Sequence, residues 1–165
     1  MAVLGWGWNK LEITKSIGGA PAENADWKLF PEVKQGTAQL TVEAGEKVEA
    51  IDEKGDVVDT RTAKSKYTFE CQIFVKKGDK KPILDEDGVI VDNYAVRLTP
   101  EDPTTEGFLM ENTSVAVEET WSATDGKLLK YTFSGLKPKS GKICKPYIAE
   151  PVEADQDSGK EEDAE

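Results

Sequence analysis

The chain has 165 residues, which suits one domain with a core of its own. Its net charge of −11 disfavours a sequence-specific DNA-binding protein, because such proteins usually carry a basic patch. No run approaches the roughly 18 apolar residues of a membrane span, and the first residues lack the regions of a secretory signal. We therefore expect no membrane association and no signal-directed secretion.

The first segment, residues 1–9, carries two tryptophans, Trp6 and Trp8, set between glycines. Two interpretations are open: the indoles cover an edge of this chain's own core, or they dock on a neighbouring subunit, since Trp is favoured at interfaces. Short strands are expected near residues 11–14 and 27–30, separated by a loop that contains glycines and a proline.

Residues 36–77 contain two alternating strands joined by a long charged connection. On the return strand the residues Tyr67, Phe69, Cys71, Ile73 and Val75 share one face, and strict alternation of this kind predicts a strand. At about 3.3 Å per residue it would span roughly 40 Å. The connection, residues 45–65, is expected either to be functional or to carry a small hairpin of its own. The pattern predicts a scaffold that projects an arm.

The following segments are shorter. Residues 83–91 predict a small hairpin around a turn at 85–88, residues 94–98 predict a strand, and residues 100–108 predict a loop or one short helical turn. Residues 115–121 and 128–133 alternate and flank Asp125-Gly126, a pair that a type I′ turn prefers. A last strand is expected within residues 142–148. These elements together predict an all-β fold, an antiparallel β-sandwich or barrel with a long projecting hairpin or loop and at most one short helix.

A folded domain is expected over residues 1–148, and an acidic tail over residues 149–165. Residues 150–165 hold eight acidic side chains and one lysine, a net charge of −7, so we expect no folded structure of their own there. Residues 126–149 hold six lysines and no acidic residue. The two segments either compensate each other, within a subunit or across subunits, or the tail is solvated without a fixed partner.

Catalytic and metal-binding signatures are scarce. The chain has no histidine, which excludes Ser-His and Cys-His nucleophiles, and two distant cysteines cannot fill a usual zinc site. Cys71 and Cys144 are expected to be buried, reduced thiols. The run Asp85-Glu86-Asp87-Gly88 lacks the oxygen ladder of an EF-hand and is better explained as a hairpin tip. We expect no enzyme, no metal and no cofactor.

Aromatic side chains leave a second function open. Trp27, Tyr67, Trp121 and Tyr131 could stack on sugars if they shared a face of a β-sandwich, as in a carbohydrate-binding module. The competing interpretation is that they pack in the core and across strands.

The order of several segments resembles phage tail tube proteins. The similar segments are Gly5-Trp6-Gly7, residues 37–50 (TAQLTVEAGEKVEA), 55–58 (GDVV), 66–75 (KYTFECQIFV), 88–100 (GVIVDNYAVRLTP), 107–111 (GFLME) and 130–138 (KYTFSGLKP). The resemblance covers most of residues 1–148, and the acidic tail lies outside it.

The resemblance implies a β-barrel or sandwich subunit, six of which form a ring, with rings stacked into a hollow tube that conducts DNA. Related tubes serve contractile injection and secretion systems. It implies a virion tail protein assembled in the host cytoplasm, with other tail or baseplate proteins as partners. It also implies that residues 45–65 contact the adjacent ring, that the N-terminal arm contributes to stacking, and that a negative lumen repels DNA phosphates. The candidate interface residues are Trp6, Trp8, Gly45, Lys47, Glu49, Asp52, Lys54, Asp56, Asp59 and Arg61.

Overall fold

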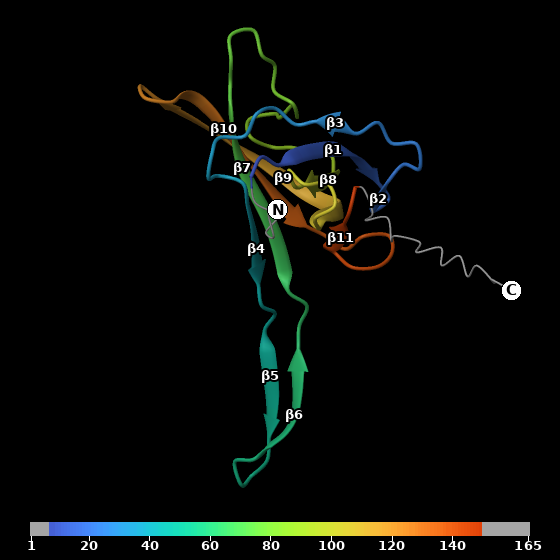
Figure 1. Cartoon of the computed structure of the whole chain (residues 1–165). Coiled ribbons are helices and arrows are strands. Elements are labelled where there is room, and N and C mark those ends of the chain that lie inside the picture. Colours follow the sequence, from blue (N-terminus) through green and yellow to red (C-terminus); the bar gives the residue numbers. More distant parts are fainter. Residues whose placement is uncertain (1–6, 150–165) are drawn as a thin grey trace, which may run out of the picture.

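The computed structural model describes residues 7–149 and has the all-β antiparallel fold that the sequence predicts (Figure 1). Its strands are β1 (Lys10–Ile17), β2 (Ala20–Pro21), β3 (Lys28–Leu29), β4 (Gln39–Glu43), β5 (Lys47–Ile51), β6 (Val57–Thr62), β7 (Lys66–Phe74), β8 (Tyr94–Thr99), β9 (Gly107–Ser122), β10 (Gly126–Gly135) and β11 (Lys145–Tyr147). Trp6 and the predicted acidic tail from residue 150 onward lie outside the described residues. Within residues 7–149, no helix has the length and apolar character needed to cross a membrane.

One nine-stranded sheet forms the body of the molecule. Its order is β2-β1-β8-β9-β10-β7-β4, with β3 beside β1 and β11 beside β9. The sheet curls into a half-barrel, and β5 and β6 form a separate ribbon that extends away from it (Figure 1).

Period-two alternation places the core on one face of this sheet. In β7 the side chains of Phe69, Cys71 and Ile73 are buried, as the alternation predicts. The register sets Phe69 opposite Phe133 and Cys71 opposite Tyr131 of β10, and the Phe69 and Phe133 ring centroids lie 6.0 Å apart. Adjacent strands therefore contribute a shared aromatic layer to the core.

The 16-residue strand β9 departs from simple alternation at its middle. Met110 and Thr113 are both fully buried although they lie three positions apart, where strict alternation would put them on opposite faces. The pairing with β8 shifts between Tyr94–Thr113 and Val96–Met110, which marks a β-bulge, and the Thr113 hydroxyl donates a hydrogen bond to the Tyr94 carbonyl at 2.6 Å. A bulge bends and twists a strand, which fits the curl of the sheet.

The turn between β9 and β10 differs from the predicted type I′ turn. Gly126 has a φ of 72° and pairs with Ser122, so the loop has three residues. Asp125 lies outside the left-handed region, because Asp87 is the one non-glycine residue with a positive φ in the described part of the chain. Gly126, the first residue of β10, follows this loop and has the left-handed conformation that glycine adopts without steric cost.

At residues 83–91 the predicted turn forms, but the two strands predicted on either side of it do not. Asp87 and Gly88 have φ values of 51° and 84°, which match a type I′ loop, and Glu86 and Val89 exchange two backbone hydrogen bonds of 2.9 Å. In the described part of the chain no strand flanks this loop: Val89 forms isolated bridges alone, to Glu86 across the turn and to Ala116 of β9.

Of the two alternatives for residues 100–108, the loop is the one that forms, and residues 107–108 already belong to β9. Within the loop, the Asp102 side chain accepts hydrogen bonds from the Thr104 backbone and hydroxyl at 3.0 and 2.6 Å. Asp102 precedes Pro103, and a residue before proline is driven away from helical angles. The last strand is β11 alone, three residues within the predicted range 142–148.

Candidate assembly interface

The ribbon of β5 and β6, together with its connections, forms an arm over residues 44–65. The last pair of the sheet beside it is Glu43 with Lys66, and the first pair of the arm is Lys47 with Thr62. At about 3.3 Å per residue, the chain from residue 43 to residue 52 reaches roughly 30 Å. Every residue from 46 to 64 is exposed. The expectation that the connection carries a hairpin of its own is therefore confirmed.

Gly45 lies where the arm leaves the sheet. A Cβ at this position would overlap the carbonyl of Ala63 on the opposite strand. Just beyond it, the Ala63 N–H donates a hydrogen bond of 2.8 Å to the Glu46 carbonyl. A close approach of two backbones is a position that favours glycine, so Gly45 determines the path of the arm and is half-buried there.

The tip of the arm is held by Asp52. One of its carboxylate oxygens accepts hydrogen bonds from the backbone N–H groups of Lys54 and Asp56, both at 2.9 Å. Gly55 completes the turn with a φ of 89°. An Asp side chain that binds its own following backbone preforms a turn. Asp52 is thus a tip-forming residue, and the side chains of Lys54 and Asp56 remain exposed.

The remaining charged candidates lie on two opposite faces of the arm. Lys47 and Glu49 share one face and form an ion pair of 3.1 Å. Arg61 pairs with Val48 on the other face, and Asp59 lies on that face two residues earlier. All four charged side chains are exposed, and an exposed ion pair contributes little to stability.

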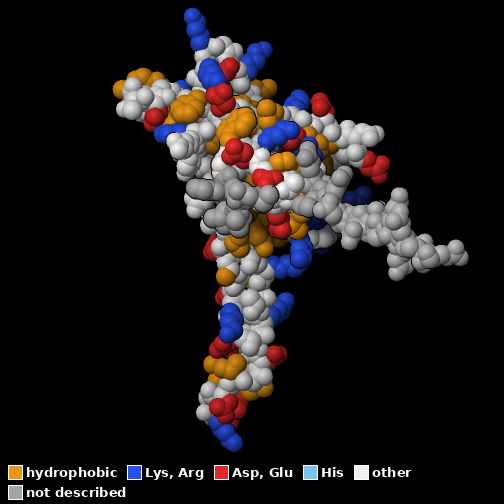
Figure 2. Space-filling model, viewed as in Figure 1, with side chains coloured by type: hydrophobic (Ala, Val, Ile, Leu, Met, Phe, Trp, Pro, Cys, Tyr) orange, Lys and Arg blue, Asp and Glu red, His pale blue; other side chains and the backbone are white. Residues whose placement is uncertain are grey.

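Aliphatic side chains on and beside the arm are a feature that the sequence analysis missed. Their exposed fractions are 52 % for Val42, 58 % for Val48, 61 % for Ile51, 52 % for Val57 and 69 % for Val58. Figure 2 shows hydrophobic side chains between charged ones along the arm. A two-stranded hairpin with both faces in water is marginally stable alone, and contiguous exposed apolar surface marks interaction sites. Charged residues alternate with these aliphatic residues, so the sequence alone is equally typical of a solvated loop and does not indicate an apolar surface.

Trp8 lies at the start of the described chain and is 81 % exposed. Its backbone N–H donates a hydrogen bond of 3.1 Å to the Glu101 carboxylate. The segment is therefore attached to the body by its backbone, while the indole does not cover the core of its own chain.

The four aromatic residues of the carbohydrate-binding alternative do not form one exposed face. Tyr131 is fully buried, and its hydroxyl donates a hydrogen bond of 3.2 Å to the Ile83 carbonyl. The Trp27 ring lies 4.3 Å from the Arg97 guanidinium, as a cation–π pair. Trp121 is 76 % exposed at the end of β9.

The described residues offer little reactive chemistry. They contain no cluster of three or more potential metal-ligating side chains. Both cysteines are unpaired thiols: burial raises the pKa of Cys71 to about 12 and also raises the pKa of Cys144, which is half-buried. A thiol with a raised pKa is a poor nucleophile at neutral pH.

No protein-family model matches the chain, and no curated protein matches it. Among solved structures, the chain is similar to one described as the sheath/tube terminator, in the extended state, of an extracellular contractile injection system (PVC), determined by cryo-electron microscopy. The two share 12 % sequence identity and a TM-score of 0.46, and the alignment covers 84 % of this chain and 93 % of that chain.

Proposed function

We propose that this protein is a non-enzymatic structural subunit of a phage tail tube or of the tube of a related contractile injection system. Its copies assemble into rings, of six subunits by the resemblance in sequence, and the arm joins one ring to the next. The stacked rings form a conduit through which DNA passes without specific contacts.

The observation that carries this proposal is the uncovered arm. It extends roughly 30 Å beyond the sheet, and both of its faces are exposed along residues 46–64. It displays the aliphatic side chains of Val48, Ile51, Val57 and Val58. Covering these side chains with another subunit removes apolar surface from water, at about 25 cal/mol per Å².

The test is replacement of residues 44–65 by Asn-Gly. Glu43 and Lys66 are directly paired, so a two-residue type I′ loop closes the remaining hairpin without strain. We expect the shortened protein to keep its β-sheet circular dichroism spectrum and cooperative unfolding. We also expect it to form no stacked rings in negative-stain microscopy, under conditions where the intact chain forms them.

A milder pair of substitutions gives a graded comparison. Val48→Thr with Val58→Thr keeps the β propensity and length of the arm but removes apolar surface. Assembly should then require a several-fold higher protein concentration. Long tubes formed by the shortened protein at the same concentration as the intact chain would refute the role of the arm.

A further inference from the structure

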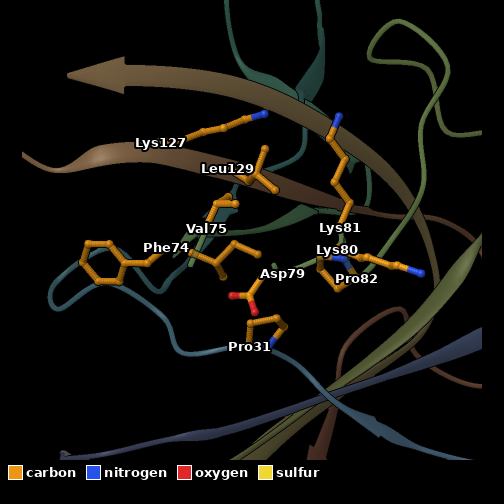
Figure 3. A pocket seen from close by; sticks show the side chains of 10 residues that line it. Pro31, Phe74, Val75, Asp79, Lys80, Lys81, Pro82, Lys127 and Leu129 are labelled. Carbon is orange, nitrogen blue, oxygen red and sulfur yellow. The ribbon is translucent and has the colours of Figure 1, made fainter. Parts of the chain in front are cut away.

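A hollow with a mixed polar and apolar lining lies at the end of the sheet opposite the arm. It encloses about 250 Å³ beside the end of β7. Its apolar lining comes from Pro31, Ile73, Phe74, Val75, Pro82 and Leu129, which Figure 3 shows in part. This volume has room for a few aliphatic side chains and is small for a drug-sized ligand.

Lysines surround this hollow. Residues 76–81, directly after β7, contain four lysines and one aspartate, a net charge of +3. Lys80, Lys81 and Lys127 line the hollow (Figure 3). Lys81 is paired with Asp85 at 2.7 Å. Lys77 and Lys80, by contrast, form no ion pair with any residue in the range 7–149, so their charges are available to a partner.

The tip of the arm has the complementary character. Residues 51–58 contain three acidic residues and one lysine, a net charge of −2. The side chains of Ile51, Val57 and Val58 are exposed by 61 %, 52 % and 69 %. The tip therefore presents aliphatic groups with a net negative surround, whereas the hollow combines apolar side chains with a surround that is net positive despite Asp79.

The tip and the hollow lie at opposite ends of one continuous segment. Residues 57–74 run through β6 and β7 from the tip to the hollow, roughly 50–60 Å at the usual strand rise (Figure 1). The two surfaces of one chain therefore cannot meet. Two copies arranged head to tail bring them together, and such a heterologous contact repeats from copy to copy.

We propose that the hollow beside β7 receives the arm tip of a second copy of this chain. Ile51, Val57 and Val58 of one copy pack on the apolar part of the hollow, while Glu53 and Asp56 face Lys77 and Lys80 of the other copy. This inference rests on the proposed function, and it specifies which surface of the neighbouring ring the arm contacts.

Disulfide trapping tests the contact directly. One chain carries Glu53→Cys and a second carries Lys80→Cys, both in a Cys144→Ala background, with the buried Cys71 retained. Under mild oxidation, we expect cross-linked dimers when the two chains are mixed and few when either is alone. Cross-linking of the Glu53→Cys chain with itself, at an efficiency equal to that of the mixture, would indicate a tip-to-tip contact and overturn the proposal.

Charge reversal provides a second, independent measurement. Lys77→Glu with Lys80→Glu should raise the protein concentration needed for assembly about tenfold at low salt, since two weak attractions become repulsions. Glu53→Lys with Asp56→Lys should have the same effect. In an equimolar mixture, every contact between unlike variants joins complementary charges, and in the combined four-site variant every contact does.

The matched control is Lys15→Glu with Lys28→Glu, which reverses two exposed lysines on β1 and β3. It should change the assembly concentration less than twofold. If the intact chain assembles but the four-site variant is no better than either two-site variant, the contact is wrong and the proposed function stands. If the intact chain remains monomeric at every concentration and salt, both proposals are overturned.

Discussion

The backbone of Gly45 runs directly against the carbonyl of Ala63, at the point where the two strands of the arm leave the sheet. Neither residue has a polar or reactive side chain, yet their contact sets the direction of the arm, which extends roughly 30 Å from the body. A subunit that stacks through this arm depends on its direction as much as on the side chains that it displays.

We therefore predict that Gly45→Val impairs assembly far more than stability. The added side chain pushes the two strands apart at the base of the arm, while the pairs of β4 with β7 remain. Overpacking of this kind costs about 1–3 kcal/mol, and the arm contributes little to the core. Chemical denaturation of the monomer and negative-stain microscopy measure the two effects.

The control for this substitution is Gly18→Asn. Gly18 has a φ of 66° and open space around its Cβ position, and Asn tolerates left-handed angles. This variant should assemble as the intact chain does. Normal tubes from Gly45→Val would show that the path of the arm is unimportant.

A second prediction concerns the tryptophans of the first segment. Trp6→Ala with Trp8→Ala should leave the melting temperature of the monomer nearly unchanged, because the Trp8 indole is 81 % exposed. Assembly should weaken at least tenfold, since truncation of a buried interface tryptophan commonly costs about 2 kcal/mol or more.

Trp121→Ala is the matched control for these indoles, because Trp121 is 76 % exposed on a different element. A fall of more than a few degrees in the melting temperature of the Trp6→Ala and Trp8→Ala protein would instead favour the interpretation that this segment covers its own core.

A third prediction concerns the charge of residues 150–165. Of the six lysines in residues 126–149, Lys137, Lys139 and Lys142 have no ion-pair partner in the part of the chain that the structure describes. If the acidic tail docks on them, removal of residues 150–165 should weaken assembly several-fold at low salt. The difference should fade at high salt, because exposed pairs are weak and are screened beyond about 8 Å at physiological ionic strength.

The informative control keeps the length of this tail and replaces its Glu and Asp residues by Gln and Asn. If the tail docks on the lysines through its charge, this variant should weaken assembly as much as the deletion does. Equal assembly of all three proteins at every salt concentration would leave a solvated tail, or a tail in the lumen that adds negative potential.

Sequence periodicity predicts much of the β-sheet, but it does not predict features that depend on how two strands pair. Strict alternation predicts the buried face of β7, including Phe69, because one face of that strand packs on a core. The bulge that buries both Met110 and Thr113 is invisible to alternation, since it depends on pairing between β8 and β9.

The Asp-Gly turns show the same limit. The chain has two such pairs, and positive φ at both residues occurs at Asp87-Gly88 rather than at Asp125-Gly126. The residue pair alone does not choose between a two-residue and a three-residue loop, because the register of the flanking strands determines the loop length.

The sequence predicts the segment of the candidate interface better than its individual residues. The length and charge of residues 45–65 indicate an arm, which the structure confirms as a hairpin. Charge points to the polar residues of this arm, whereas the exposed aliphatic side chains, such as Ile51 and Val58, become evident only when both faces of the ribbon are seen to be uncovered.

The last prediction concerns the buried ion pair between Glu12 of β1 and Arg97 of β8. Their side chains meet at 2.8 Å across a directly paired position, and the Glu12 side chain is 9 % exposed. Burial raises the pKa of Glu12, but the hydrogen bonds and charges of Arg97 and Lys10 outweigh it and hold the pKa below its ordinary value. The charged form of Glu12 therefore stabilises the folded state.

Glu12→Gln should lower the free energy of unfolding at pH 7 by about 3 kcal/mol, because the substitution leaves Arg97 without its buried counter-charge. Since the folded pKa of Glu12 is lowered, its stabilisation is fully present above the unfolded pKa of about 4.3 and is lost as the pH falls through the folded value. The difference in the free energy of unfolding between wild type and Glu12→Gln should thus be constant from pH 6 to 8 and shrink below about pH 4.

Urea unfolding of the monomer, followed by tryptophan fluorescence, measures this difference. The control is Glu23→Gln, at an exposed position. A difference of the same size at pH 3 as at pH 7 would show that packing, rather than the charge of Glu12, accounts for the effect.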